Sequence, residues 1–323
     1  MNTSQDIRAA IVLAVRRSRQ RRDRLAGRIM SLLAGAAVLL VPLIAMALFL
    51  RAWPILAAKP LDELLFSSTW SPQRGAFGFL PFILGTVWVT GMAMLIAVPP
   101  SLLTAIYLAE YARPRLRAIV NPIIDLLAGI PSVVYGVWGV LTVVPFVGKH
   151  VAPTLDGWLG DAIPLFRNTN PTGYNLLSGA LVLAVMVFPF IIAMAQDVIY
   201  VVPQGLREAS FALGATRWQT IRRVVLRRAW VGVMAAIVLG FSRAFGETMA
   251  VLMVVGNVPQ VPRSIFDPAY PLPALIANNY GEMMSIPMYD AALLGAALIL
   301  PLMVLVFNVV ARLVLIRWAR SEG

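Results

Sequence analysis

Long apolar runs alternate along this chain with polar connections. A transmembrane α-helix needs about 20 consecutive, mainly apolar residues. Six runs meet that requirement or come close to it, namely residues 29–50, 80–98, 126–148, 176–195, 229–256 and 291–311. The pattern therefore predicts an all-α integral membrane protein with six transmembrane helices.

Proline and glycine interrupt two of these runs. Pro99–Pro100 follow the second run directly, so the sequence predicts that this span stops before them and that residues 101–111 form a separate helical piece. The third run contains Pro131, Gly136 and Gly139, which weaken a straight helix. We expect either a kink there or close packing against a neighbouring helix.

The composition supports a membrane protein and narrows its chemistry. Of the 323 residues, 59% are hydrophobic and 13% are charged, whereas about 25% of residues are charged in soluble domains. The chain has no cysteine and one histidine, His150, which excludes disulfides, thiolate metal sites and histidine clusters. It also lacks the G-x-x-x-x-G-K-[ST] phosphate-binding loop, so it is not itself a P-loop ATPase. The sequence predicts a non-catalytic protein with no metal-ligating residue.

The basic residues are distributed unequally between the two sides of the predicted bundle. Of the 27 Lys and Arg residues, 20 lie in the two termini and in connections 110–125 and 196–228, and six lie in the other three connections. The positive-inside rule therefore places both termini and connection 196–228 in the cytoplasm. Because these charges serve membrane orientation, the formal net charge of +12 does not indicate nucleic-acid binding.

Two charged residues stand inside the fifth apolar run. Arg243 and Glu247 are one helical turn apart, and a charge at this depth costs about 2.5–3.5 kcal/mol on insertion scales. Intramembrane charges are functional by default, and a guanidinium presents several donors to an oxyanion at any working pH. We predict a substrate pathway formed by Arg243, Glu247 and their small neighbours Ser242 and Thr248. An internal ion pair that only fixes helix packing is the alternative.

The polar stretch 207–228, which precedes that span, carries six arginines. By charge alone it fits a basic helix that lies on anionic lipid headgroups. Its residue order is more specific, because Glu208-Ala209-Ser210 is followed after three residues by Gly214 and then by a basic amphipathic run. This spacing resembles the coupling loop, or EAA loop, of ABC importer permeases.

In that family the glycine lets a short helix turn sharply, and the loop docks into a groove of a cytoplasmic ATPase. The resemblance implies six residues that contact the ATPase: Glu208, Ala209, Phe211, Gly214, Ala215 and Trp218. Glu208 is expected near a helix start, where negative charge is favoured, and Gly214 at a bend that other residues resist. The family usually has proline where this chain has Arg227.

Other segments extend the resemblance to most of the chain. FLPFILGT (79–86), AGIPSVVYGVWG (128–139), EASFALGATRWQTI (208–221) and SRAFGETMAV (242–251) are similar to the C-type permease subunits of phosphate importers. The similarity covers residues 75–318. It implies the type I ABC importer permease fold.

We therefore expect three parts. Residues 1–28 form a basic cytoplasmic N-terminal segment. Residues 29–74 form the first transmembrane helix, which we interpret as an anchor and not as a signal peptide, together with an external loop. Residues 75–318 form the permease domain, with its cytoplasmic coupling loop at 201–228.

The resemblance also implies partners in a bacterial inner membrane. They are a second homologous permease subunit, a dimer of cytoplasmic ATP-binding subunits, an external phosphate-binding protein, phosphate and membrane lipid. No cofactor is expected in this chain, because ATP and magnesium would bind to the partner ATPase. Two alternatives remain: an ABC permease for another oxyanion such as phosphonate or sulfate, and a stand-alone anion channel or carrier.

Overall fold

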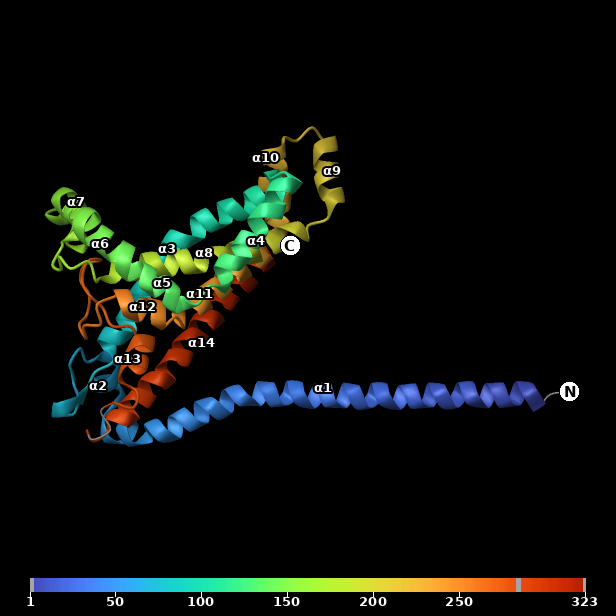
Figure 1. Cartoon of the computed structure of the whole chain (residues 1–323), viewed down its shortest axis with the longest axis horizontal. Coiled ribbons are helices and arrows are strands. Elements are labelled where there is room, and N and C mark those ends of the chain that lie inside the picture. The colour runs from blue at the N-terminus through green and yellow to red at the C-terminus, as the bar shows by residue number, and fades with distance from the viewer. Residues whose placement is uncertain (1–2, 283–285, 322–323) are drawn as a thin grey trace. The chain divides into compact units, whose positions relative to one another are not determined.

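The computed structural model describes residues 3–282 and 286–321 (Figure 1). The chain divides into two units, residues 1–51 and residues 52–323. The first unit consists of most of helix α1 (Thr3–Ala58). Between residues 22 and 50 this helix exposes nearly every side chain, including a long series of leucines and valines. Such a helix requires a lipid environment, as the predicted first span does.

Six helical segments in the described part of the chain are long and apolar enough to cross a membrane. They are Arg22–Ala58, Leu80–Tyr111, Ser132–Gly160, Leu176–Tyr200, Arg217–Phe245 and Tyr289–Val314. The predicted all-α fold with six transmembrane helices is therefore confirmed, although several of the predicted boundaries are wrong.

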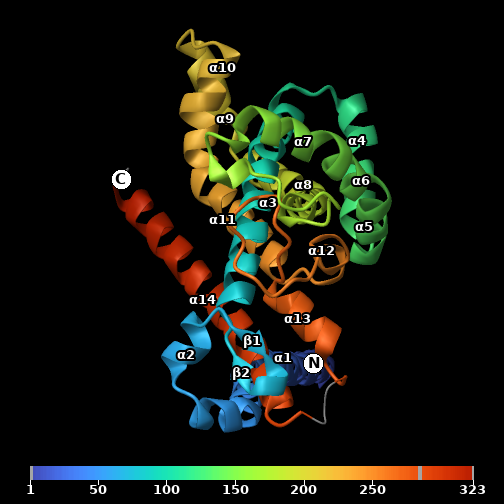
Figure 2. The same cartoon turned by 90° about the vertical axis from the view of Figure 1, so that its left-hand side faces the viewer.

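The second unit is built around α8 (Leu176–Tyr200), which packs along α3 (Leu80–Ile106) and α11 (Leu226–Phe245). In Figures 1 and 2 the three helices form the centre of this unit. The remaining helices are α2 (Leu61–Phe66), α4 (Pro114–Gly129), α5 (Ser132–Trp138), α6 (Val144–Phe146), α7 (Ala152–Leu155), α9 (Gln204–Ala212), α10 (Arg217–Thr220), α12 (Met249–Val254), α13 (Leu272–Asn279) and α14 (Tyr289–Ser321). A hairpin of β1 (Trp70–Ser71) and β2 (Ala76–Phe77) pairs Trp70 with Phe77.

Short segments of other helical types complete the elements. The π-helical ones are Tyr107–Tyr111, Gly139–Val143, Val147–Val151, Asp156–Gly160 and Ile221–Val225, and the 3₁₀-helical ones are Pro72–Arg74 and Pro164–Phe166. The π-helical segments continue α3, α5, α6, α7 and α10 without a break in the helix. Arg227, at the position where the family usually has proline, lies in α11 two residues after the π-helical segment Ile221–Val225, and the helix from α10 into α11 is continuous.

The prediction that Pro99–Pro100 end the second span is wrong, because α3 runs through both prolines. Small residues at every fourth position on one face of α3 are all buried, two before the prolines and two after them: Ala93, Ala97, Ser101 and Ala105. The Ser101 hydroxyl donates to the carbonyl oxygen of Ala97 at 2.6 Å and to that of Phe188 in α8 at 3.4 Å. Packing of this face against α8 outweighs the two missing N–H groups, as neighbouring helices commonly allow in membranes.

The third span also differs from its predicted boundaries of 126–148. Helix α4 ends at Gly129, Ile130 and Pro131 are extended, and a new helix then runs from Ser132 to Gly160. Proline disfavours helical backbone in the residue before it, which explains a full break in place of a kink.

The predicted close packing around the glycines of this span is confirmed. A Cβ atom on Gly136 would lie 3.2 Å from the Cα atom of Ala250, and one on Gly139 would lie 2.8 Å from a methyl group of Val254. The missing side chains thus allow α5 and the π-helical segment after it to lie directly against α12.

Candidate functional site

The fifth span, expected to be one helix over 229–256, is broken at its charged residues. Helix α11 ends at Phe245, residues 246–248 are not helical, and α12 begins at Met249. The Glu247 carboxylate accepts a hydrogen bond from the backbone N–H of Ala250 at 3.1 Å, so it caps the first turn of α12. Gly246 followed by Thr248, a residue type preferred at the N-cap, is a helix-boundary signal in this sequence, and Thr248 is the N-cap residue of α12.

Arg243 and Glu247 do not form an ion pair in the structure. The Arg243 guanidinium donates to the carbonyl oxygen of Ala128 at 3.4 Å and lies 5.0 Å from the ring centroid of Phe190. Among the described residues no carboxylate pairs with it, and its side chain is exposed in the isolated subunit. A cation–π contact holds a guanidinium without occupying its N–H donors, which stay available to an anion.

Glu247 faces a different environment. It is half-buried and lines a small cavity of about 10 Å³ together with Thr86 and Thr90 of α3 and Pro271. Because α11 ends between the two charged residues, they no longer share one helix face. The predicted position of Glu247 one turn along the same helix is therefore wrong, and the reason is the break at Gly246.

The breaks of the third and fifth spans meet beside Arg243. Ala128, whose carbonyl oxygen contacts Arg243, lies just before the break between α4 and α5, and the Tyr135 hydroxyl donates to the neighbouring carbonyl oxygen of Leu127 at 2.8 Å. Unwound backbone inside a membrane is tolerated only where it is buried in protein or lines a cavity, and transporters use such breaks as binding sites. Ala128 and Tyr135 lie in the segment 128–139 that resembles phosphate permeases, but no sequence pattern placed them, or Phe190, next to Arg243, because only the tertiary fold does so.

Thr248 and Ser242, the two small residues of the predicted pathway, contact different parts of the fold. Thr248 is at the break, where its hydroxyl donates to the carbonyl oxygen of Gly246 at 3.3 Å. Ser242 instead donates to the carbonyl oxygen of Val238 and to the Asn308 side chain, both at 3.0 Å, so it joins α11 to α14.

The predicted coupling loop forms two short helices, α9 and α10, joined by a sharp turn. Gly214 in that turn has φ of +80°, a backbone conformation that other residues rarely adopt. A capping box of Thr216 and Gln219 then starts α10. Both helices lie at the end of the second unit opposite to α2 and the hairpin, and α14 ends at the same end as they do (Figures 1 and 2). The predicted bend is confirmed.

The turn exposes large apolar side chains. Phe211 is 47% exposed, Trp218 51% and Leu213 89%. Glu208 and Ala209 are exposed as well, and Ala215 is half-buried. Glu208 is the fifth residue of α9, so the prediction that it lies at a helix start is wrong. Arg207 beside it is not a solvated basic residue, because its guanidinium forms an ion pair with Glu110 at 2.7 Å.

A second hollow, of about 1340 Å³, lies at the end of the unit opposite to α9 and α10. Most of its lining residues belong to two connections, one before α8 and one after α12. Its polar residues include Thr169, Asn170, Asn257, Gln260 and Arg263. Hydropathy and charge placed this region in external loops without assigning it a role.

Broken membrane helices around an exposed arginine, with a sharply bent helical loop at one end, define a membrane transport protein. Comparison with known proteins makes the assignment specific. Residues 101–318 match the profile of the family described as "binding-protein-dependent transport system inner membrane component", and the chain belongs to this family.

Individual relatives agree with that membership. The chain is 39% identical over 262 residues to the phosphate transport system permease protein PstC of Pasteurella multocida, with 80% of this chain and 81% of the relative covered. It is 38% identical over 297 residues to PstC of Xylella fastidiosa, with 90% of each chain covered. Such relatives are permease subunits, which are generally non-catalytic.

A solved structure supports the type I ABC importer permease fold. The inward-facing MetNI methionine ABC transporter matches with a TM-score of 0.51 and 21% identity, over 72% of this chain and 91% of that chain. At this identity the likeness speaks for the fold alone.

Proposed function

We propose that this chain is the permease subunit of an ATP-driven importer and forms half of the pathway for inorganic phosphate. The observation that carries the proposal is the state of Arg243, which is held by an aromatic ring and one carbonyl oxygen with no carboxylate paired to it among the described residues. Support also comes from the permease proteins named for phosphate transport that match 80–90% of the chain.

The mechanism follows from the chemistry of that arginine. A guanidinium binds phosphate oxygens through forked, charge-assisted hydrogen bonds. A conducting site must also release its ion, so the arginine must bind the anion transiently. Glu247, on the other side of the helix break, would discourage tight trapping of an anion through its negative charge. The other half of the pathway would come from a second, homologous permease subunit.

The energy source would be a pair of cytoplasmic ATPase subunits that bind ATP and magnesium. They would dock on the coupling surface, defined as the exposed side chains of Glu208, Ala209, Phe211, Leu213 and Trp218. Exposed large apolar side chains at a membrane protein's polar end are typical of a protein contact. An external binding protein would deliver phosphate at the opposite end, where the 1340 Å³ hollow opens.

Phosphate uptake tests this function directly. Cells whose own phosphate uptake has been deleted should take up labelled phosphate when this chain is expressed with its partner subunits. Arsenate should compete with uptake, and sulfate and phosphonate should not. Equal competition by sulfate or phosphonate would assign the chain to another oxyanion. Uptake that persists without the ATPase would make it a stand-alone carrier.

The orientation in the membrane is a separate prediction. The chain contains no cysteine, so a single introduced thiol can be labelled without background. Ala118 in α4 and Ala162 after the third span are both exposed alanines, on opposite sides of the predicted topology. With an impermeant thiol reagent, Ala162→Cys should react in intact cells and Ala118→Cys only after permeabilisation. Labelling of Ala118→Cys in intact cells would contradict the orientation.

A further inference from the structure

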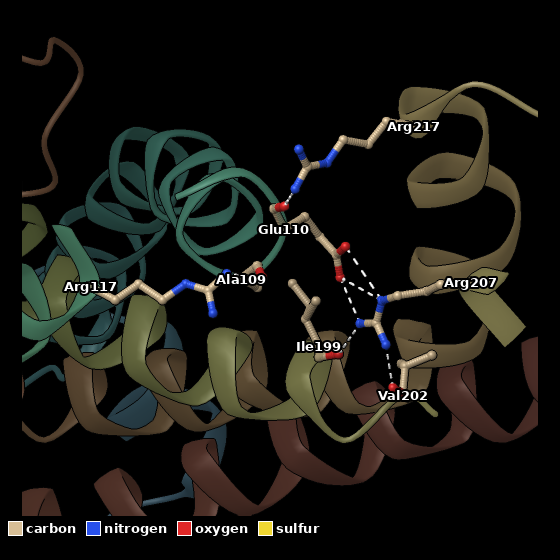
Figure 3. A network of polar contacts seen from close by, with 7 residues as sticks. All are labelled: Ala109, Glu110, Arg117, Ile199, Val202, Arg207 and Arg217. Carbon is tan, nitrogen blue, oxygen red and sulfur yellow. Dashed lines mark hydrogen bonds and ion pairs between the residues drawn. The ribbon is translucent and has the colours of Figure 1, made fainter. Parts of the chain in front are cut away.

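A buried ion pair joins the coupling helix α9 to the end of the second span. Glu110 lies in the π-helical segment Tyr107–Tyr111 that continues α3, and Arg207 lies in α9 (Figure 3). The Arg207 Nη2 atom is 2.7 Å from Glu110 Oε1, and Nε is 3.2 Å from the same oxygen. The two side chains are 12% and 9% exposed. Because a buried charge cannot be left unpaired cheaply, this contact resists separation.

The same guanidinium also joins α9 to α8. Arg207 donates to the carbonyl oxygen of Ile199 in α8 at 3.1 Å and to that of Val202, two residues beyond the end of α8 (Figure 3). The last carbonyl groups of a helix lack i+4 partners, so the end of α8 can accept these additional donors. One side chain therefore connects the coupling helix with two membrane-spanning helices.

Two further arginines hold the end of the second span in place. Arg217 of α10 donates to the backbone carbonyl oxygen of Glu110, and its guanidinium lies 4.8 Å from the ring centroid of Tyr111. Arg117 of α4 donates to the carbonyl oxygen of Ala109 at 2.8 Å and lies 5.0 Å from the ring centroid of Tyr200 in α8. The segment that carries Glu110 is thus fixed against its neighbours.

The rest of α9 is mostly exposed. Arg207 and Ser210 are the α9 residues that are not exposed, and Ser210 shares a hydrogen bond of 2.9 Å with Thr220 of α10. Ser210 therefore holds α9 to α10 at the start of the fifth span, and Arg207 holds α9 to α8 and to the end of the second span. A displacement of α9 reaches α3 and α8 through Arg207.

The two helices that Arg207 connects to α9, namely α3 and α8, also carry residues that surround Glu247 and Arg243. Helix α8 carries Phe190, whose ring forms the cation–π contact with Arg243. Phe190 is about two and a half helical turns from Ile199. Helix α3 carries Thr86 and Thr90, which line the cavity at Glu247. The ion pair therefore joins the coupling surface to the helices that form the surroundings of Arg243 and Glu247.

We propose that Glu110 and Arg207 are positioning residues that transmit movement of the α9 coupling helix to α3 and α8, and so couple ATP hydrolysis to opening of the pathway. This inference rests on the proposed function, since it requires an ATPase bound at the coupling surface. Neither residue contacts the transported anion.

The test compares transport with ATP hydrolysis in the complete complex. Glu110→Gln keeps the size of the side chain and removes its charge. The complex would be reconstituted in proteoliposomes with the binding protein and phosphate, and phosphate uptake and ATP hydrolysis would be measured in the same sample. We expect a normal amount of co-purified ATPase and continued hydrolysis, with the phosphate moved per ATP reduced about tenfold.

A matched control is available at the other end of the unit. Glu63→Gln breaks the ion pair between Lys59 and Glu63, in which the Glu63 side chain is 47% exposed. This variant should leave the phosphate-to-ATP ratio unchanged. A second variant, Arg207→Lys, keeps the positive charge but cannot donate to Glu110, Ile199 and Val202 at the same time in this geometry, and its ratio should fall about threefold.

The outcomes separate this inference from the proposed function. A normal ratio in both Glu110→Gln and Arg207→Lys overturns the inference, and so does loss of the ATPase from both complexes, since the pair would then only shape the docking surface. If Glu110→Gln fails to reach the membrane, Arg207→Lys decides alone. Failure of the proposed function would instead appear in the wild-type complex, as an absence of phosphate uptake.

Discussion

Replacing Arg243 with glutamine is expected to reduce phosphate uptake about tenfold to a hundredfold, because a charge-assisted hydrogen bond to the anion is lost. The subunit should still fold and assemble, since the Arg243 side chain is exposed in the isolated chain and forms no ion pair among the described residues. Uptake of labelled phosphate, normalised to the amount of complex in the membrane, measures the effect. Arg243→Lys, which keeps the charge but not the planar fork, should retain part of the activity.

A double variant distinguishes substrate binding from a structural role of the charges. Glu247→Gln keeps an oxygen that can accept the hydrogen bond from Ala250, so α12 should remain capped. If Arg243 mattered only as a neutraliser of Glu247, removing both charges would restore uptake. We expect the double variant Arg243→Gln with Glu247→Gln to assemble and to remain inactive. Recovered uptake would remove Arg243 from the pathway.

Replacing Gly214 with valine is expected to weaken binding of the ATPase about tenfold and to reduce transport accordingly. The positive φ of Gly214 strains any residue with a branched side chain by about 1–3 kcal/mol, enough to lower ATPase retention about tenfold. Nothing lies within 4 Å of a Cβ atom built on this glycine, so the effect would come from the backbone and not from a clash within the subunit. Co-purification of the ATPase in detergent measures it.

Gly214→Asn is the matched control for that experiment. Asparagine also adds a side chain at the coupling surface, but it tolerates left-handed backbone far better than valine does. It should therefore retain most of the ATPase. If valine and asparagine behave alike, the bend at Gly214 is not what the ATPase requires, and the loop would fit the alternative of a basic helix on lipid headgroups.

Local sequence patterns predicted the features that depend on a single segment. The number of spans follows from apolar length, since a helix must cross the hydrocarbon layer wherever its neighbours lie. The bend at Gly214 follows from the absence of a side chain there. The prediction that Arg243 functions in transport rests on the cost of placing a charge in the membrane.

Patterns failed where packing between helices competes with local preference. Pro99–Pro100 break an isolated helix, but the buried face of α3 continues across them against α8. The run 229–256 looks like one span by hydropathy, yet Gly246 and the Glu247 cap divide it. In the first case contacts with α8 outweighed the local signal, and in the second a local signal at Gly246 and Glu247 was hidden by the apolar length of the run.

By itself, the sequence determined a six-span, all-α membrane protein with a bent coupling loop and an arginine at membrane depth. The tertiary structure alone decided which groups surround the charges: Phe190 and Ala128 at Arg243, Thr86 and Thr90 at Glu247, and Glu110 at Arg207. The physical reason is sequence distance. Glu110 and Arg207 are 97 residues apart, and hydropathy, periodicity and capping signals describe only neighbours along the chain, whereas an ion pair or a cation–π contact forms wherever packing brings two groups together.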